Sequence, residues 1–177
     1  VVIAGNGVHA AKAYAELQQL AELLAMPVAT TWQGKSAFPE SHPLAIGLMG
    51  TFGERVGNQE VNKADVLLVV GSTLSPLDTC SENPELIDPA RQKIIQVEVD
   101  PRNAGWIFPV EVGLIGDAKI VLTQLLEALG EEKIDRLPYV EEPRIRELQQ
   151  EKELDFINSP ACHDDREPIL RERMVHE

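Results

Sequence analysis

The sequence places glycines directly after two apolar runs, a position from which backbone groups could bind a phosphate. Gly5-Asn6-Gly7 follows Val1–Ala4, and Gly71-Ser72 follows Val66–Val70. Glycine lets backbone N–H groups approach a phosphate, and the dipole of a helix that begins there helps. Both turns also suit a plain connection between elements, so the two interpretations stay open. The first turn departs from the full G-x-G-x-x-G fingerprint, because the third glycine is replaced by Ala10.

Acidic residues follow two later apolar runs. Glu98 and Asp100 end the run that begins at Lys93, and an acid at a strand end can accept hydrogen bonds from ribose hydroxyls. The alternative role is a cap or turn before Pro101. Gly116-Asp117 could bring a backbone N–H and a carboxylate close to adenine or ribose. Asp117 also suits the N-cap of a helix, and both roles can coexist.

No pattern in the sequence is typical of a catalytic or metal site. Ser72, Ser75 and Cys80 have no histidine near them in the sequence that could activate a nucleophile. Cys80 and Cys162 lie far apart and match no zinc-ligand spacing. We therefore predict that the chain supplies no catalytic residue and no metal ligand, and whether its turns bind a nucleotide stays open.

The elements that would position these turns follow from the apolar pattern. Short apolar runs predict strands at residues 1–4, 28–31, 44–46, 66–70, 93–99 and 110–115. Helical spacing predicts helices at residues 9–25, 54–63 and 117–129, the last closed by Gly130. Strands that alternate with helices indicate an α/β fold with a parallel sheet of about six strands and helices on both faces. In such a sheet, ligands bind at the carboxyl ends of the strands.

Composition excludes several classes of partner. The formal net charge of −13 and the pI near 4.7 argue against binding to nucleic acid or to an anionic membrane. No apolar run approaches the roughly 20 residues of a membrane span, and two isolated thiols favour the cytoplasm. The chain opens within a predicted strand and without an initiator Met, which suggests a fragment of a longer protein.

The composition changes after Gly130. We predict a domain at residues 1–130, followed by a charged helical and linker segment at residues 131–177. Within that segment, a surface helix is expected at 147–154, an irregular linker at 158–165 and the start of another helix at Pro168.

The order and spacing of these motifs resemble the central domain of thiamine-diphosphate-dependent enzymes, the group that includes acetolactate synthase, pyruvate oxidase and benzoylformate decarboxylase. The resemblance covers about residues 1–130, and Pro168–Arg173 resembles the segment that leads into the third domain of these enzymes. The motifs that carry it are Val2–Gly7, Pro27–Thr31, Gly34–Glu40, His42–Leu44, Ala64–Ser72, Ile94–Pro101 and Gly116–Ala118.

The resemblance implies a Rossmann-like domain of the DHS-like NAD/FAD-binding type. Flanking pyrimidine- and diphosphate-binding domains of the same chain would carry thiamine diphosphate and Mg²⁺, in a homodimer or homotetramer. This domain would hold the ADP part of FAD, or ADP, or nothing. The implied contacts are Gly5, Asn6, Gly7, Thr30, Thr31, Met49, Gly50, Gly71, Ser72, Glu98, Val99, Asp117 and Ala118. Acetolactate synthases carry an arginine near the position of Thr73, and threonine supplies neither its charge nor its reach.

Three functions are compatible with these residues. The first is a component of an enzyme that decarboxylates a 2-oxo acid or joins it to a second substrate. The second is a free-standing nucleotide-binding module without catalysis. The third is a structural domain that orients its neighbours, because a fold does not by itself determine a function.

Overall fold

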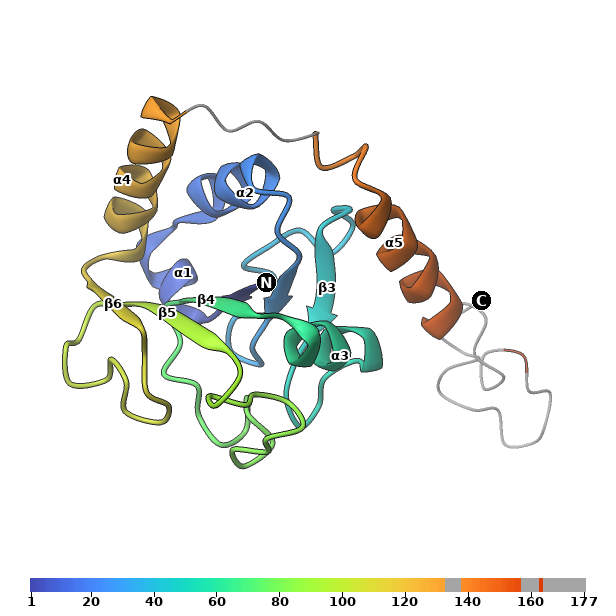
Figure 1. The fold of residues 1–177 in the computed structure, drawn as a ribbon, viewed down its shortest axis with the longest axis horizontal. Helices are drawn as coiled ribbons and strands as arrows, with labels where there is room; N and C mark the ends of the chain where they lie inside the picture. The colour runs from blue at the N-terminus through green and yellow to red at the C-terminus, as the bar shows by residue number, and fades with distance from the viewer. Residues whose placement is uncertain (133–137, 157–162, 164–177) are drawn as a thin grey trace.

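Six parallel strands form a single sheet in the computed structural model, which describes residues 1–132, 138–156 and 163 (Figure 1). The order across the sheet is β3-β2-β1-β4-β5-β6. The strands are β1 (Val2–Ala4), β2 (Val28–Thr30), β3 (Ala45–Leu48), β4 (Val66–Val70), β5 (Lys93–Glu98) and β6 (Val112–Ile115). Every predicted strand is present, and the predicted α/β fold with a Rossmann-like sheet is confirmed.

The central strands are apolar along their whole length because helices and loops cover both faces of the sheet. β1 is fully buried and pairs with β2 on one side and with β4 on the other, so that Val2 lies opposite Val28 and Leu68. Along these central strands, neither face therefore offers a solvent-exposed side on which polar residues would alternate with apolar ones.

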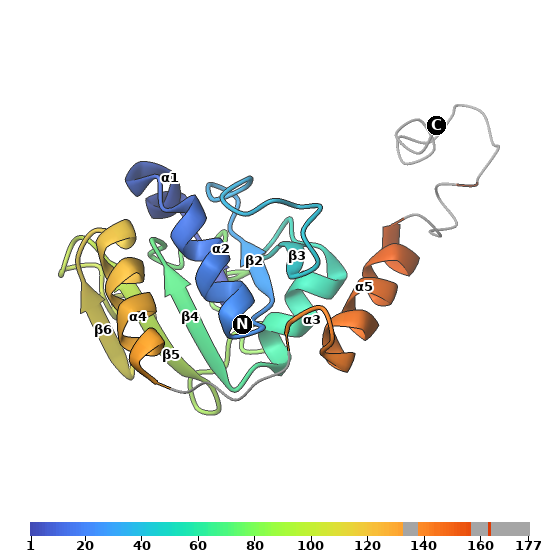
Figure 2. The same cartoon turned by 90° about the horizontal axis from the view of Figure 1, so that it is seen from above.

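Helices α1 (Asn6–Ala11), α2 (Tyr14–Leu23) and α4 (Ala118–Glu131) cover one face (Figures 1 and 2). Leu17 and Leu20 of α2 and Leu122 of α4 join one buried cluster with residues of β1 and β4. Helix α3 (Arg55–Lys63) covers the other face, where Val61 packs with Ile3 and Ile94. The predicted arrangement of helices on both faces is confirmed.

Three helix boundaries differ from the prediction. The single helix expected at residues 9–25 is two helices, because Lys12 adopts a left-handed conformation with φ of 53° and ends α1. Asn6 and Gly7, expected in a turn, form the start of α1. Gly130 lies inside α4, with open space where a Cβ would stand, and Glu132 is the C-cap. The apolar spacing runs across the break at Lys12, so periodicity could not reveal it.

The segment after α4 returns to the domain. Its helix α5 (Pro143–Phe156) begins four residues before the expected surface helix, and Ile145 and Leu148 are both 3% exposed. The side chains of Gln149 and Lys152 donate hydrogen bonds of 2.5 Å to the carbonyl groups of Pro43 and Ala45. The helix therefore lies beside the outer edge of β3 (Figure 2). The linker expected at 158–165, apart from residue 163, and the helix expected from Pro168 lie outside the described residues.

None of the helices in the described residues combines the length and the apolar character that crossing a bilayer would require.

Candidate functional site

A cavity lies where the strand order reverses. The chain adds β2 and β3 on one side of β1 and then crosses to the other side for β4, β5 and β6. At the carboxyl ends of β1, β2, β4, β5 and β6 lies a cavity of about 410 Å³. Its lining consists of Asn6, Gly7, Ala10, Ala11, Thr31, Gln33, Gly71, Ser72, Thr73, Ser75, Asp78, Val97, Glu98, Val99, Gly116, Asp117 and Ala118. This is the position at which open α/β sheets bind their ligands.

The two glycine turns form one wall by pressing against each other. A Cβ on Gly7 would lie 2.5 Å from the Cα of Gly71, and Gly71 has a φ of +62°. Gly7 also donates its N–H to the carbonyl of Gly71 at 2.8 Å. Close approach of two backbones therefore requires both glycines. The structure supports the tight-turn interpretation of these residues.

The remaining glycine N–H groups of these turns are also paired within the protein. Gly5 donates to the carbonyl of Val70, and Gly71 donates to that of Val97, both at 2.9 Å. A Cβ on Gly5 would lie 2.4 Å from the carbonyl oxygen of Gly71. The glycine amides expected to approach a phosphate hold the β1 and β4 ends together instead.

Three carboxylates belong to the lining. Glu98 is 6% exposed, and its Oε1 accepts hydrogen bonds from the N–H groups of Val99 and Asp100 at 2.9 and 3.2 Å. Asp117 caps α4, with Oδ1 accepting from Lys119 and Ile120. Both acids thus serve as turn or helix caps, as their alternative interpretations predicted. Each uses one oxygen for this, so within the described residues Glu98 Oε2 and Asp117 Oδ2 have no hydrogen bond from the protein.

Asp78 is the third carboxylate, and the sequence did not reveal it. It lies in the long segment between β4 and β5, is 8% exposed, and accepts hydrogen bonds from Ser75 Oγ at 2.9 Å and from the N–H of Trp32 at 3.3 Å. Trp32 is 46 residues away in the chain. No local pattern marks such a contact, because it depends on how the loop folds across the ends of β1 and β2.

No lysine or arginine is present among the described residues that line the cavity. The nearest basic residue after β5 in the sequence is Arg102, whose guanidinium group forms an ion pair of 2.6 Å with Asp100. Hydrogen bonds from Arg102 lower the pKa of Asp100 to about 2. Arg102 and Asp100 therefore neutralise each other, and Glu98 is the carboxylate at this strand end that lines the cavity.

Nine of the thirteen predicted contacts line the cavity, and four do not. Those brought together are Asn6, Gly7, Thr31, Gly71, Ser72, Glu98, Val99, Asp117 and Ala118. Gly5 is buried against Gly71, and Met49 is 1% exposed in the core. Asn58 holds Gly50 by hydrogen bonds to its N–H and carbonyl groups. Thr30 is 4% exposed, and its buried hydroxyl has no hydrogen-bond partner among the described residues.

Other lining residues escaped the prediction for different reasons. Ala10 and Ala11 lie on α1, and in the sequence Ala10 stands out only as the residue that replaces the third glycine of the fingerprint. Gln33, Ser75 and Val97 carry no signal of their own in the sequence. Among the described residues, no three His, Cys, Asp or Glu side chains are grouped as a metal site.

The chain is similar in sequence to known proteins. A family model described as "Thiamine pyrophosphate enzyme, central domain" matches residues 1–125. The chain is 37% identical over 176 residues to a probable acetolactate synthase large subunit of Methanocaldococcus jannaschii, covering 99% of this chain and 28% of that protein. It is 40% identical over 131 residues to a sulfoacetaldehyde acetyltransferase of Roseovarius nubinhibens, covering 74% of this chain and 22% of that protein.

A solved structure is also similar. The X-ray structure of a putative thiamin diphosphate-dependent enzyme from Mycobacterium smegmatis matches with a TM-score of 0.58 and 28% sequence identity. The match covers 77% of this chain and 26% of that one. The chain thus spans about a quarter of the length of the proteins that it resembles.

Proposed function

The chain belongs to the family of thiamine pyrophosphate enzyme central domains, and we propose that it is the middle domain of a longer enzyme that acts on a 2-oxo acid. Its homologues are thiamine-dependent enzymes, and the chain corresponds to one domain of them. The observation that carries the proposal is the match of residues 1–125 to the central domain, in a chain whose cavity is lined by groups that can bind a ligand. The parent reaction is decarboxylation or carboligation.

The flanking domains supply the chemistry in this proposal. Thiamine diphosphate, held with Mg²⁺ between the pyrimidine- and diphosphate-binding domains, supplies a carbanion-stabilising centre when bound. None of the described residues of the present chain contributes a ligand to that group in this proposal. Residues 131–177 form the connection toward the diphosphate-binding domain, and the parent is a cytoplasmic homodimer or homotetramer.

The cavity gives the domain a binding role of its own. We propose that it accepts the adenosine part of an adenine nucleotide, either ADP or the ADP part of FAD. Val97, Val99 and Ala118 offer apolar contacts for a base, and the second oxygen of Glu98 can accept a hydrogen bond from a ribose hydroxyl. The diphosphate fits the lining poorly. Thr73 occupies the position near which acetolactate synthases carry an arginine, and no described lining residue is a lysine or arginine.

Calorimetric titration of the 177-residue chain with ADP and with FAD, up to millimolar concentration, tests the binding role. Val99→Trp fills the cavity from a side chain that is 69% exposed, so the fold tolerates it. Val112→Trp on β6 is the matched control outside the lining. We expect saturable binding that Val99→Trp removes and Val112→Trp preserves. Failure of both ligands to bind would leave a structural domain.

The native parent protein tests the enzymatic role. We expect its intact mass to be several times that of this chain, and its consumption of a 2-oxo acid to require added thiamine diphosphate and Mg²⁺. A native protein of the mass of this chain would instead favour a free-standing nucleotide-binding module.

A further inference from the structure

The lining of the cavity determines which part of a nucleotide it can hold. We propose that the cavity binds an uncharged nucleoside, adenosine in the simplest case, more tightly than the 5′-phosphorylated forms of the same nucleoside. This inference rests on the proposed binding role and specifies its ligand class. It reverses the usual preference of a Rossmann-like cavity, in which phosphate contacts supply much of the affinity.

The first argument concerns hydrogen-bond donors. A phosphate needs N–H groups directed at it, and the glycine turns at the ends of β1 and β4 are the usual source. Here the N–H groups of Gly5, Gly7 and Gly71 donate to carbonyls of Val70, Gly71 and Val97 at 2.8–2.9 Å. A phosphate can engage these amides only by breaking the contacts that hold the two strand ends together.

The second argument concerns side-chain donors on the same wall. The hydroxyl oxygen of Ser72 accepts a hydrogen bond from the N–H of Leu74, at 3.1 Å. The hydroxyl of Ser75 donates to Asp78. The Ser75 hydroxyl is thus already used as a donor within the loop after β4, whereas the Ser72 hydroxyl accepts there and keeps its own proton.

The third argument is charge. Asp78, Glu98 and Asp117 place three carboxylates on the lining, and no described lining residue is a lysine or arginine. Asp78 and Glu98 are at most 8% exposed, so water screens them weakly toward the cavity. Each phosphate that enters adds negative charge to an already negative wall. The resulting repulsion grows with every added phosphate.

A nucleoside suits the same wall. Ribose hydroxyls and the exocyclic amino group of adenine are hydrogen-bond donors, and the wall is rich in acceptors. Glu98 Oε2 and Asp117 Oδ2, which have no hydrogen bond from the described residues, can receive them. Val97, Val99, Ala10, Ala11 and Ala118 supply apolar surface for the base. The cavity therefore matches the uncharged part of the ligand in both polarity and hydrogen-bond direction.

Titration of the full chain with adenosine, AMP and ADP tests the proposed order of affinities. The buffer is low in salt and contains EDTA, so that no divalent cation neutralises the phosphates. We expect the affinity to fall by roughly threefold or more with each phosphate added to the ligand. Added salt should reduce the differences in affinity among the three ligands. ADP binding as tightly as adenosine, or more tightly, would overturn the inference and leave the proposed nucleotide site intact. Failure of all three ligands to bind would contradict the proposed binding role itself.

A charge added to the wall supplies the second test. Thr73→Arg introduces a cation at a partly exposed lining position, and Thr123→Arg introduces the same group at a partly exposed position of α4 outside the lining. We expect Thr73→Arg to raise the affinity for ADP relative to adenosine by roughly tenfold, and Thr123→Arg to leave the ratio unchanged. An unchanged ratio in Thr73→Arg would show that wall charge does not select the ligand.

Discussion

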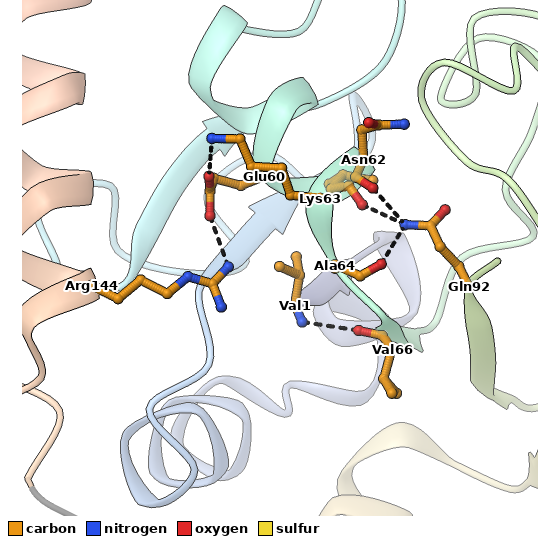
Figure 3. A network of polar contacts seen from close by, with 9 residues as sticks. Val1, Glu60, Asn62, Lys63, Ala64, Val66, Gln92 and Arg144 are labelled. Atoms are coloured by element: carbon orange, nitrogen blue, oxygen red, sulfur yellow. Dashed lines mark hydrogen bonds and ion pairs between the residues drawn. The ribbon is translucent and has the colours of Figure 1, made fainter.

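At the scale of single residues, buried glutamines join parts of the chain that are distant in sequence. Gln96 on β5 is 2% exposed; its Nε2 donates to the carbonyl of Ser72 at 2.9 Å, and its Oε1 accepts from the N–H of Gly105 at 2.8 Å. Gln92, 4% exposed, plays a similar part directly before β5, where it donates to the carbonyl of Ala64 (Figure 3) and to that of Val61. The first glutamine supports the cavity and the second does not.

Gln96→Leu tests this difference. The variant leaves the Ser72 carbonyl and the Gly105 N–H without partners, so we expect the free energy of unfolding to fall by about 1–3 kcal/mol. Gln92→Leu is the control. It should lower the free energy of unfolding by a similar amount, because it also leaves buried backbone groups without partners. Urea denaturation measures both. Only Gln96→Leu should also weaken adenosine binding; equal binding by the two variants would contradict a positioning role for Gln96.

When the 177-residue chain is studied by itself, the α-amino group of Val1 makes its stability depend on pH. It donates to the carbonyl of Val66 at 3.1 Å (Figure 3), and burial, followed by the charge of Arg144, lowers its pKa from 8.0 to about 6. Glu60 and Asp65 oppose this shift. Between pH 6 and 8 the unfolded amine holds more protons than the folded one, so we expect stability to rise with pH across this range.

N-terminal acetylation is the control for that prediction, because it removes the titrating amine and keeps every side chain. Thermal unfolding at pH 6 and pH 8 gives the comparison. The difference in Tm between the two pH values should be smaller for the acetylated chain. An equal difference would show that the pH dependence does not arise from the α-amino group.

At the scale of elements, α5 is held to α3 by charge as well as by apolar packing. Glu60, which is 5% exposed, accepts hydrogen bonds of 2.9 Å from both Lys63 and Arg144 (Figure 3). Burial opposes ionisation of Glu60, but the hydrogen bonds from Arg144 and Lys63 outweigh it and lower its pKa. A buried carboxylate of this kind depends on its partners.

Arg144→Met tests the contact between these helices. Methionine keeps much of the aliphatic side chain and removes the charge-assisted hydrogen bond, so we expect a loss of about 1–2 kcal/mol in the free energy of unfolding. Proteolysis within α5 should become faster. Adding Glu60→Gln to Arg144→Met should recover part of the loss, because it removes the buried charge. No recovery in the double variant would indicate that only the packing of Arg144 matters.

At the scale of the whole molecule, the two edges of the sheet differ. At the β3 edge, Gln149 and Lys152 of α5 bond the carbonyls of Pro43 and Ala45. At the other edge, β6 pairs only with β5 among the described strands, and Val112 and Ile115 are 42% and 50% exposed. An uncovered edge with apolar side chains promotes association between chains.

Removal of α5 tests its role as an edge cover. A chain that ends at Glu132 exposes the β3 edge and the apolar surface under Ile145 and Leu148, whereas a chain that ends at Phe156 keeps both covered. We expect the shorter chain to have a lower Tm and to associate, and the longer one to behave like the full chain. Light scattering coupled to size-exclusion chromatography measures the association. Identical behaviour of the two chains would mean that α5 is dispensable.

The sequence by itself determined the six strands, because each apolar run is long enough to require burial and short enough to exclude a helix. It determined the Asp117 cap as well, since capping involves only neighbouring residues. The order and spacing of its motifs determined the family. The sequence did not reveal the break between α1 and α2 at Lys12, because the apolar spacing continues across it.

Only the tertiary structure decided what the cavity can hold. The contact between Gly7 and Gly71, the entry of Asp78 into the lining and the docking of α5 on β3 all join residues far apart in the chain. Glycines at strand ends are equally suited to receive a phosphate or to let two backbones meet. Which of these occurs depends on the partner to which each N–H is directed, and that partner is set by the packing of distant strands.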